Sequence, residues 1–346
     1  MRRRCIGLDV HRDFAQVAIW EDGVVEHAGQ ITTTAEELAV FADSLGRGDE
    51  VALEATGNSW AVAEVLARRG VRVVVGNPGK IRVIAEAKVK TDKIDAAVLA
   101  QLLAAGFLPA VWMPDDGTHL LRRLVMRRAP VVRQRTRLEN QVQAILARNL
   151  ITRCPAADLF GGKGRAWLSQ QMLPADERGT VAALLRQLDF LGSELVEVDT
   201  LVGQQALARP TVHRLMTIPG VDATVALSIV ATVGDFHRFP HPEKLVSYLG
   251  LNPRVRQSGG QPASHGRITK QGRAHARGML VEAAWVAVKS PGPLRAFFQR
   301  VRARRYADRC GRHGPQARRT VLAPGGARRR LCLRPSLVDR AEATRA

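Results

Sequence analysis

The chain has 346 residues, a length that predicts two or three domains at about 100–200 residues each. Hydrophobic residues make up 46% and charged residues 24%, which excludes a collagen-like chain, a disulfide scaffold and wholesale disorder. The net charge is +20, but residues 1–110 hold 13 Lys and Arg against 15 Asp and Glu, so the rest holds 39 against 17. A strongly basic body behind a near-neutral domain predicts a nucleic-acid partner, with an arginine-favouring coding bias as the alternative.

The sequence indicates neither an oxidising compartment nor a membrane. The four cysteines, Cys5, Cys154, Cys310 and Cys332, lie far apart and form no zinc-binding spacing. The basic N-terminus MRRRCIGLDVHRD has a short apolar run that Asp9 interrupts, so we expect no signal peptide. No stretch of about 18 uncharged apolar residues is present, and we expect no membrane partner.

Residues 1–110 predict an α/β domain with a mixed sheet. A three-strand meander comes first, and helices and strands alternate after it. Gly70 is a fitting residue for the end of a helix. In chain order, we expect strands at 5–10, 14–20 and 23–31, a helix at 35–45, a strand at 51–54, a helix at 59–69, a strand at 71–75 and mostly helix over 80–104.

Residues 111–209 predict an arginine-rich helical region. Residues 117–150 contain eight Arg and no Lys on a helical pattern, which Pro130 is expected to kink or break, and Gly and Pro interrupt the insert at 151–179. A later apolar seam with spacings of three and four predicts a coiled coil. It would form a helical hairpin or a dimer contact, with packing on its own domain as the alternative. The seam comprises Val181, Leu184, Leu188, Leu191, Leu195, Val198 and Val202.

Residues 210–300 predict a compact, mostly α-helical domain. Pro210 opens it, and Ser290 and Pro291 end its last regular helix. The segment 252–272 is rich in Gly, Ser and basic residues and is expected to be a loop. The expected helices are a helix–turn–helix over 213–235, a helix over 243–249 and a helix over 273–289.

Four acidic residues stand out by their positions. Asp9 and Glu54 lie at the ends of buried strands, where an unneutralised carboxylate carries a desolvation cost. Asp92 and Asp95 are spaced i, i+3 on a predicted helix and therefore share one face. Mg²⁺ ions held by such acids can clamp the attacking and leaving oxygens of a phosphodiester. Taken singly, each acid is better explained as a solvated residue, an ion-pair partner or a turn cap, so the joint pattern carries the prediction.

The segments GLDVHRD, ALEATGNSW and KTDKIDAAVLAQLL together resemble one known domain. It is the RuvC-like domain of the insertion-sequence one-ten transposases, also called the one-ten/eleven-eleven family. The resemblance implies a ribonuclease-H-like α/β fold with Mg²⁺ or Mn²⁺ as cofactor. It also implies that the DEDD metal ligands are Asp9, Glu54, Asp92 and Asp95.

Two motifs of residues 210–300 point to DNA phosphates. RLMTIPGVDATVALSIVATVGD resembles a helix–hairpin–helix, which presents backbone N–H groups to phosphates. Asp222 stands where a glycine is usual, and a plain helical hairpin is the alternative. LVSYLGLNPRVRQSGGQPASHGRITKQGRAHARGML resembles the C-terminal transposase domain of the same family, which implies that Ser258 is the catalytic nucleophile. Gly259 and Gly260 would allow a DNA strand to approach closely, whereas spacing alone makes Ser258 an ordinary loop serine.

Positive charge surrounds the Ser258 segment. Because a serine hydroxyl is a poor nucleophile, a pentacoordinate phosphate would need charge stabilisation. His265 is either an acid–base group or a phosphate contact. The candidate nucleic-acid-binding residues are Arg254, Arg256, Arg267 and Lys270 near the serine, and Arg273 and Arg277 at i, i+4 on the next helix.

Three other hydroxyl groups compete with Ser258 for the role of nucleophile. Ser247 lies in an apolar helix and is interpreted as structural, and Ser264 lies in the same loop as Ser258. Tyr248 is the only tyrosine before the basic tail and has apolar neighbours in sequence. Because no Arg-His-Arg set can be assembled around it from the sequence, we favour a core role for Tyr248.

The resemblance covers about residues 4–300 and implies a DNA transposase or recombinase. In that family a structured non-coding RNA from the element's own ends pairs with donor and target DNA, and the protein reads RNA shape and backbone. The resemblance also implies a homodimer or homotetramer in which the DEDD domain of one subunit meets the serine domain of another. A cytoplasmic, bacterial and nucleoid-associated location follows.

Two alternatives to this function stay open. One is a metal-only nuclease resembling a Holliday-junction resolvase, which needs the four acids but not Ser258. The other is a non-catalytic RNA- and DNA-binding protein derived from a transposase. The first predicts cleavage without a protein–DNA adduct, and the second predicts binding without cleavage.

Residues 301–346 depart from the family pattern. They hold 13 Arg, no Lys and little periodicity, so we expect a basic, disordered tail. Family members continue here with a further regular helix. The segment is therefore interpreted as the product of a frameshift, which resequencing of the locus would test.

Overall fold

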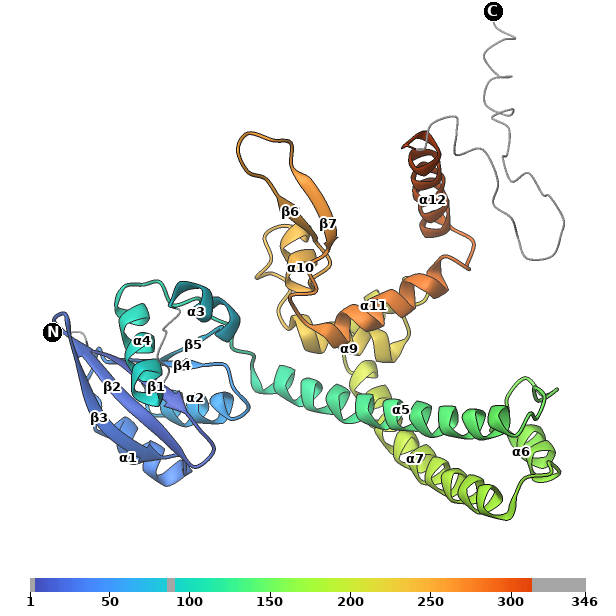
Figure 1. Cartoon of the computed structure of the whole chain (residues 1–346). Helices are drawn as coiled ribbons and strands as arrows, with labels where there is room; N and C mark the ends of the chain where they lie inside the picture. Colours follow the sequence, from blue (N-terminus) through green and yellow to red (C-terminus); the bar gives the residue numbers. More distant parts are fainter. Residues whose placement is uncertain (1–3, 86–90, 313–346) are drawn as a thin grey trace, which may run out of the picture. The chain divides into compact units, whose positions relative to one another are not determined.

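The computed structural model describes residues 4–85 and 91–312, and the chain splits into two compact units, residues 1–120 and residues 121–346 (Figure 1). The division lies later than the boundary at 110 expected from the sequence. The backbone explains the difference, because Val111 N donates to Val75 O at 2.7 Å and so ties the following segment to the sheet of the first unit. No helix in the described ranges is long and apolar enough to cross a bilayer.

The first unit contains a five-stranded mixed sheet with the strand order β3-β2-β1-β4-β5. The first three strands form an antiparallel meander, and β4 and β5 extend it in parallel with β1. The mixed α/β architecture expected from the sequence is therefore confirmed. The strands are β1 (Cys5–Val10), β2 (Phe14–Glu21), β3 (Val24–Thr32), β4 (Glu50–Glu54) and β5 (Arg72–Gly76).

Helices cover both faces of this sheet, so its central strands are buried on both sides. On one face, α1 and α2 pack against alternate residues of β1 and β4, such as Ile6, Leu8 and Leu53. On the other face, Cys5 and Ala52 pack with α3 and α4. The helices are α1 (Ala35–Asp43), α2 (Ser59–Arg68), α3 (Pro78–Ile84) and α4 (Asp92–Ala104).

Most of an antiparallel helical hairpin lies in the second unit, and its first helix starts at the end of the first unit. It is formed by α5 (Asp116–Arg148) and α7 (Ala175–Leu207), with α6 (Gly162–Ser169) in the connection. Val142 of α5 packs in one cluster with the seam residues Leu184 and Leu188 of α7, so these seam residues pack in a hairpin within the chain.

The proline in α5 does not break the helix. The helix runs through Pro130, so of the expected kink or break, the break is wrong. Proline removes the hydrogen bond to the carbonyl four residues earlier, and Met126 at that position is exposed. We attribute the continuity to the tertiary packing of the neighbouring Val125 and Ala129, which are both buried.

From residue 210 to residue 312, the last described one, the second unit is helical except for one β-hairpin. The segment expected to be a loop at 252–272 contains this hairpin, whose two strands are exposed at every residue and so carry no alternating hydrophobic pattern. The last helix begins with Pro293 and extends past residue 301, because its Ala and Arg residues favour helix. The expected disordered tail therefore starts no earlier than 313, and residues 313–346 lie outside the described ranges. The elements are α8 (Pro210–Met216), α9 (Ala223–Val233), α10 (Pro242–Tyr248), β6 (Pro253–Arg256), β7 (Ser264–Ile268), α11 (Ala274–Ala287) and α12 (Pro293–Arg312).

Candidate metal centre and basic hairpin

The carboxyl ends of two adjacent parallel strands bring acidic residues to one edge of the sheet. Leu8 of β1 pairs with Leu53 of β4, so Asp9 and Glu54 follow at neighbouring positions. Asp9 is the penultimate residue of β1, and its side chain is only 17% exposed. Glu54 is the last residue of β4 and is half-buried. The sheet register alone therefore delivers two of the four acids to the same edge.

Helix α4 brings the other two acids to this edge. Thr91 caps its N-terminus by accepting a hydrogen bond from Ile94 N at 3.3 Å, which fixes Asp92 and Asp95 in the first turn. The helix can lie close to β1 because Gly7 has no side chain at the contact. Tertiary packing and helix capping together therefore position Asp92 and Asp95 beside Asp9.

A histidine lies between two of these acids. His11 Nε2 is 3.2 Å from Asp9 Oδ2 and 3.4 Å from Asp92 Oδ2. Among the described residues, the group with ligand atoms within 4.8 Å of one another comprises Asp9, His11 and Asp92. Neither Glu54 nor Asp95 belongs to that group. Sequence reasoning missed His11, although its position two residues after Asp9 in GLDVHRD was the available signal.

The backbone around His11 holds the ring in place. Asn58 Nδ2 donates to His11 O at 2.7 Å, which links the start of α2 to the turn after β1. The His11 ring stacks on Phe14 with a centroid distance of 4.7 Å. His11 N also donates to Phe14 O at 2.8 Å. The imidazole is therefore a positioned group at the edge of the acidic cluster.

The electrostatics of the cluster fit a divalent cation. Burial raises the pKa of the Asp9 carboxyl, and the nearby charges of Asp95 and Asp92 raise it further, whereas His11 opposes the change. Carboxylates that repel one another in a partly buried place are stabilised by a bound cation. Carboxylate oxygens suit Mg²⁺, and a mixed set of oxygens with one imidazole suits Mn²⁺ as well. The residues present therefore fit the cofactor expected from the sequence.

Ser258 lies in the turn of the β6–β7 hairpin and is exposed. Gln261 N donates to Ser258 O at 3.1 Å, which closes the turn. Gly259 and Gly260 follow with φ of 57° and 73°, in the left-handed region that favours glycine. The turn that carries the Ser258 hydroxyl therefore depends on a left-handed backbone at the two residues after it, which glycine adopts easily.

The hairpin carries its basic residues in a defined register. Arg256 pairs with Ser264, and Val255 pairs with His265. A bulge follows, in which Gly266 and Arg267 together oppose Arg254. Arg254, Arg256 and Arg267, like Lys270 after β7, are exposed. These basic side chains are therefore exposed to solvent along the β6–β7 hairpin that carries Ser258.

The two arginines of the following helix differ in their surroundings. Arg277 is half-buried, and its Nη1 donates to Leu249 O at 3.2 Å and to Lys270 O at 3.4 Å. These bonds tie the base of the hairpin to α11, so Arg277 has a positioning role in the structure. Arg273 is exposed at the N-cap of α11. Burial would raise the pKa of the Tyr248 hydroxyl, but Arg273 and Arg238 outweigh it, so this pKa is lowered.

The competing hydroxyls occupy different places. Ser264 begins β7, and Ser247 is exposed on α10 rather than packed as a structural residue. Tyr248 is half-buried, packs against Phe239 at a centroid distance of 5.3 Å and donates its hydroxyl to Thr232 O at 3.1 Å. Two arginines that the sequence did not connect with Tyr248 lie near it in the structure. The Arg238 guanidinium is 4.5 Å from the centroid of its ring, and Arg122 Nη2 donates to the same Thr232 O at 3.2 Å.

The turn between α8 and α9 is closed to a phosphate. Asp222 caps α9 by accepting a hydrogen bond from Val225 N at 2.7 Å, so a carboxylate already occupies that helix N-terminus. A Cβ atom on Gly220 would lie 2.3 Å from Ala283 O, so the turn packs directly against α11. These contacts favour the plain helical hairpin over a phosphate-binding helix–hairpin–helix.

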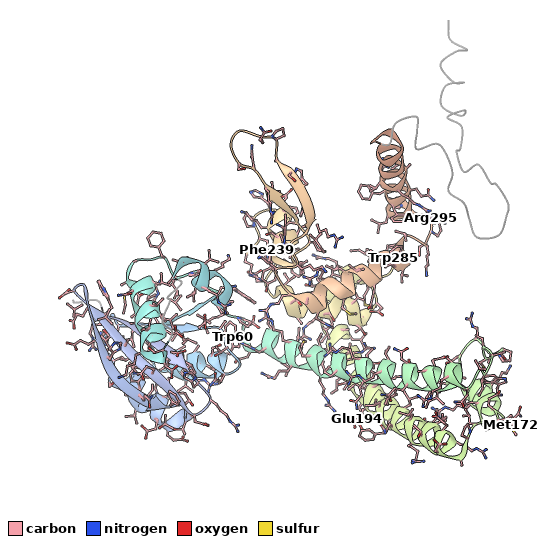
Figure 2. All side chains as sticks on the ribbon, in the orientation of Figure 1. Trp60, Met172, Glu194, Phe239, Trp285 and Arg295 are labelled. Carbon is pink, nitrogen blue, oxygen red and sulfur yellow. The ribbon has the colours of Figure 1, made fainter. Side chains whose placement is uncertain are left out.

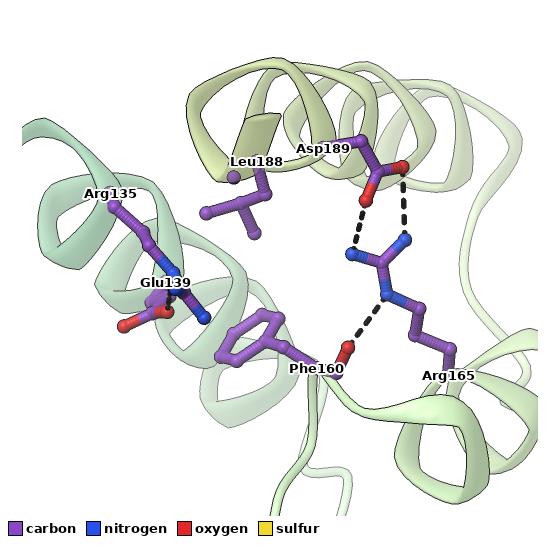
Figure 3. Close-up of a pocket in the computed structure, with 7 residues that line it drawn as sticks. Arg135, Glu139, Phe160, Arg165, Leu188 and Asp189 are labelled. Carbon is purple, nitrogen blue, oxygen red and sulfur yellow. Dashed lines mark hydrogen bonds and ion pairs between the residues drawn. The ribbon is translucent and has the colours of Figure 1, made fainter. Parts of the chain in front are cut away.

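A cavity of about 190 Å³ lies near the far end of the α5–α7 hairpin (Figure 3). Arg165 Nη1 is 3.0 Å from Asp189 Oδ2, and its Nε donates to Phe160 O at 2.8 Å. Arg135 Nε donates to Glu139 Oε1 at 3.0 Å. Because the charged groups that line the cavity pair with one another, we interpret it as part of the hairpin's packing.

Two family models match the chain. The model described as the transposase IS116/IS110/IS902 family matches residues 212–299. A transposase model named for the DEDD domain of IS110 matches residues 6–150. The first match covers the basic hairpin, and the second covers the acidic cluster.

Curated relatives agree with these matches. A putative transposase of Sinorhizobium fredii is 33% identical over 57% of this chain, which spans about half, 48%, of that relative's length. The transposase for insertion sequence element IS1111A of Coxiella burnetii is 24% identical over 81% of this chain and 77% of its own length. A pilin gene-inverting protein of Moraxella bovis is 27% identical over 60% of this chain and 57% of its own length.

Proposed function

The chain belongs to the IS116/IS110/IS902 family of transposases, enzymes that cut and rejoin DNA, and from this premise we propose that it transposes an insertion sequence through a covalent serine intermediate. The observation that carries the proposal is the cluster of Asp9, Asp92 and His11 at the sheet edge. It supports a metal-assisted phosphoryl-transfer centre, because oxygen-rich clusters of this kind serve phosphodiester chemistry.

The acidic cluster supplies the electrostatic part of the mechanism. Asp9 and Asp92 would hold a Mg²⁺ or Mn²⁺ ion, with Glu54 and Asp95 as the further ligands. The bound ion would neutralise the carboxylates and offset the negative charge that grows on the reacting phosphate. His11 keeps Asp9 and Asp92 oriented toward one another through its contacts with both.

The hairpin supplies the nucleophile. The Ser258 Oγ attacks a DNA phosphorus, a new Oγ–P bond forms and the bond from phosphorus to the 3′ oxygen breaks. The serine proton ends on the departing 3′ hydroxyl, and the DNA is left as a 5′-phosphoserine. Attack by a second 3′ hydroxyl on this linkage reseals the strand and frees Ser258, so bonds and protons balance over the cycle. Arg254, Arg256, Arg267 and Lys270 support the charge of the phosphate.

A guide RNA and a second subunit complete the proposal. The excess of positive charge lies beyond residue 110, which favours contacts with nucleic-acid backbones rather than with bases. Few aromatic residues are available to stack bases, since Phe, Trp and Tyr make up 5% of the chain. We therefore propose that an element-encoded RNA pairs with donor and target DNA. In this scheme a homodimer or homotetramer combines the acidic cluster of one subunit with Ser258 of another.

A metal-only nuclease is the second candidate. The acidic cluster is formed entirely within the first unit, without any residue of the hairpin. A hydrolytic enzyme of that kind would use water in place of Ser258. It would cut DNA but form no protein–DNA adduct.

A trapping assay for covalent adducts tests the proposal. Purified protein is incubated with DNA carrying the element's joined ends and Mg²⁺, with and without RNA transcribed from the flanking non-coding sequence. We expect an RNA-dependent adduct that Ser258→Ala and Asp9→Ala abolish and that Ser264→Ala, a hydroxyl on the same hairpin, retains. Cleavage without an adduct that survives Ser258→Ala would establish the metal-only nuclease instead. RNA binding without any reaction would indicate a non-catalytic protein.

A further inference from the structure

The histidine at the acidic cluster faces two carboxylates with one nitrogen atom. Among the described residues, the compact group of possible ligand atoms contains His11 beside Asp9 and Asp92, all within 4.8 Å of one another. His11 Nε2 is 3.2 Å from Asp9 Oδ2 and 3.4 Å from Asp92 Oδ2. Glu54 and Asp95, the two other acids predicted as ligands, do not belong to this group. The third member of the compact group is therefore an imidazole and not a carboxylate.

The two distances from His11 Nε2 suit a shared metal ion better than a single hydrogen. This nitrogen carries at most one hydrogen, whereas two carboxylate oxygens face it at nearly equal distances. Both distances exceed the ~2.7–2.9 Å of a charge-assisted hydrogen bond. Neighbouring ligands of an octahedral ion with bonds of ~2.1 Å lie about 3.0 Å apart, and opposite ligands about 4.2 Å. A small movement of the three side chains toward one another would therefore place all three atoms on one ion.

The surroundings of His11 hold its ring at this place. The ring stacks on Phe14 with an interplanar angle of 26°, and Asn58 Nδ2 donates to His11 O at 2.7 Å. Asn58 precedes α2, whose second residue, Trp60 (labelled in Figure 2), packs edge-on against His119 at a centroid distance of 5.5 Å. These contacts fix the start of α2 and, through Asn58, the turn that carries His11. A ligand that is held in place before an ion binds loses little conformational entropy on binding.

An ion and a substrate phosphate can reach this group from solvent. Asp9 is the most buried of the three, with a side chain that is 17% exposed, whereas the side chains of His11 and Asp92 are 40% and 48% exposed. Each of the three residues offers one ligand atom, so an octahedral ion keeps places for water or for phosphate oxygens. The imidazole therefore contributes a ligand without closing the centre to DNA.

Resting on the proposed metal-assisted function, we propose that His11 Nε2 is a ligand of the metal ion together with Asp9 and Asp92, and that this nitrogen makes the centre prefer Mn²⁺ to Mg²⁺. Mg²⁺ is a hard cation that takes oxygen ligands and gives up its water reluctantly. Carboxylates suit both ions, whereas an imidazole nitrogen suits transition-metal ions. His11 is therefore a residue that determines metal specificity, in addition to orienting the two carboxylates in the metal-free protein.

Electron paramagnetic resonance of Mn²⁺ added to the whole chain tests the preference. The signal of free Mn²⁺ falls as the ion binds, and competition with Mg²⁺ gives the affinity for the second ion. We expect His11→Gln to weaken Mn²⁺ binding about tenfold and Mg²⁺ binding less than about twofold. His27→Gln, which changes an exposed histidine of β3, is the matched control and should alter neither affinity. Equal weakening of the binding of the two ions by His11→Gln would overturn the proposed preference.

Pulsed measurements on the wild-type protein with bound Mn²⁺ detect the ligand directly and do not depend on whether a variant folds. We expect a nitrogen hyperfine coupling that changes when the histidines carry ¹⁵N and that is absent in His11→Gln. Bound Mn²⁺ without nitrogen coupling in the wild type, at a site that Asp9→Ala abolishes, would overturn this inference alone and leave His11 as a positioning residue. Mn²⁺ binding that Asp9→Ala does not weaken, or no Mn²⁺ binding to the wild type, would overturn the proposed metal centre as well.

Discussion

A Cβ atom on Gly7 would lie 1.9 Å from the backbone carbonyl oxygen of Ala96. Strand β1 and helix α4 therefore meet backbone to backbone at this point. Asp9 lies two residues further along β1, and Asp92 is the first residue of α4. The contact between Gly7 and Ala96 thus sets how closely the acids of the strand and of the helix approach one another.

Gly7→Ala should destabilise the first unit and weaken metal binding. The added methyl group meets backbone rather than a flexible side chain, so α4 must move away from β1, at a cost of about 1–3 kcal/mol or more. Urea unfolding and titration with Mn²⁺ measure the two effects. Gly57→Ala is the control, since nothing lies within 4 Å of a Cβ there, and it should change stability by less than about 0.5 kcal/mol. Equal behaviour of the two variants would contradict the proposed contact.

The parts of the fold that sequence could predict are those with a local pattern. The strands β1 and β4 follow from short apolar runs and the seam at Leu184 and Leu188 from periodicity, and the structure buries both. The β6–β7 hairpin has no such pattern, because both strands are exposed, and its pairing depends on contacts at its base such as Lys270 N to Gly250 O at 3.1 Å. Local sequence therefore indicated only a loop there.

The candidate site residues also divide into those with a local sequence pattern and those brought together by tertiary packing. Asp9 and Asp92 were predicted from strand ends and helix spacing, and the structure brings them together. His11 was missed because it was interpreted as part of a polar turn. Arg122 and Tyr248 both donate to Thr232 O although they are more than a hundred positions apart, so only tertiary structure reveals that they lie close together. Residues that act through long-range packing leave no spacing in the sequence.

Asp49 should make the stability of the first unit depend on pH. Burial alone would raise the pKa of its carboxyl, but hydrogen bonds from Arg4 and from Gly46 N outweigh it, so the folded pKa lies below the usual value. The group therefore stabilises the fold above about pH 4, and this contribution is lost as the pH falls through the folded pKa. Asp49→Asn should lower the free energy of unfolding by about 1–3 kcal/mol at pH 7. It should also make that free energy depend less on pH in the acidic range.

The measurement for Asp49 is hydrogen exchange of β1 and β4 peptides at neutral and acidic pH. Asp43→Asn is the control, because Asp43 forms an exposed ion pair with Arg69 at 2.6 Å. It should change stability by about 0–1 kcal/mol. If Asp49→Asn loses stability at acidic pH as steeply as the wild type does, other carboxyl groups govern the pH dependence.

Asp222 should contribute to stability and not to DNA binding. It caps α9 through Val225 N, so Asp222→Ala should lower the free energy of unfolding by about 0.5–2 kcal/mol, and Asp222→Asn, which preserves the cap, should lower it far less. Neither variant should alter the salt dependence of DNA binding, because the turn packs against α11 through Gly220. A marked gain in DNA affinity from Asp222→Asn would instead support phosphate binding at this helix hairpin.

Gly259 should control how the turn presents Ser258. Its φ of 57° is unfavourable for most residues by about 1–2 kcal/mol, but asparagine adopts this region more readily than alanine does. Nothing lies within 4 Å of a Cβ at this position, so backbone strain is the whole effect of a substitution. Gly259→Ala should therefore slow formation of the serine–DNA adduct about tenfold, while Gly259→Asn stays close to wild type and neither changes overall stability by more than about 2 kcal/mol. Rates measured by gel-resolved trapping over time decide the matter. Equal rates of adduct formation for Gly259→Ala and Gly259→Asn would mean that the turn changes its conformation on binding DNA. The left-handed backbone of the free protein would then have no part in aligning the Ser258 hydroxyl.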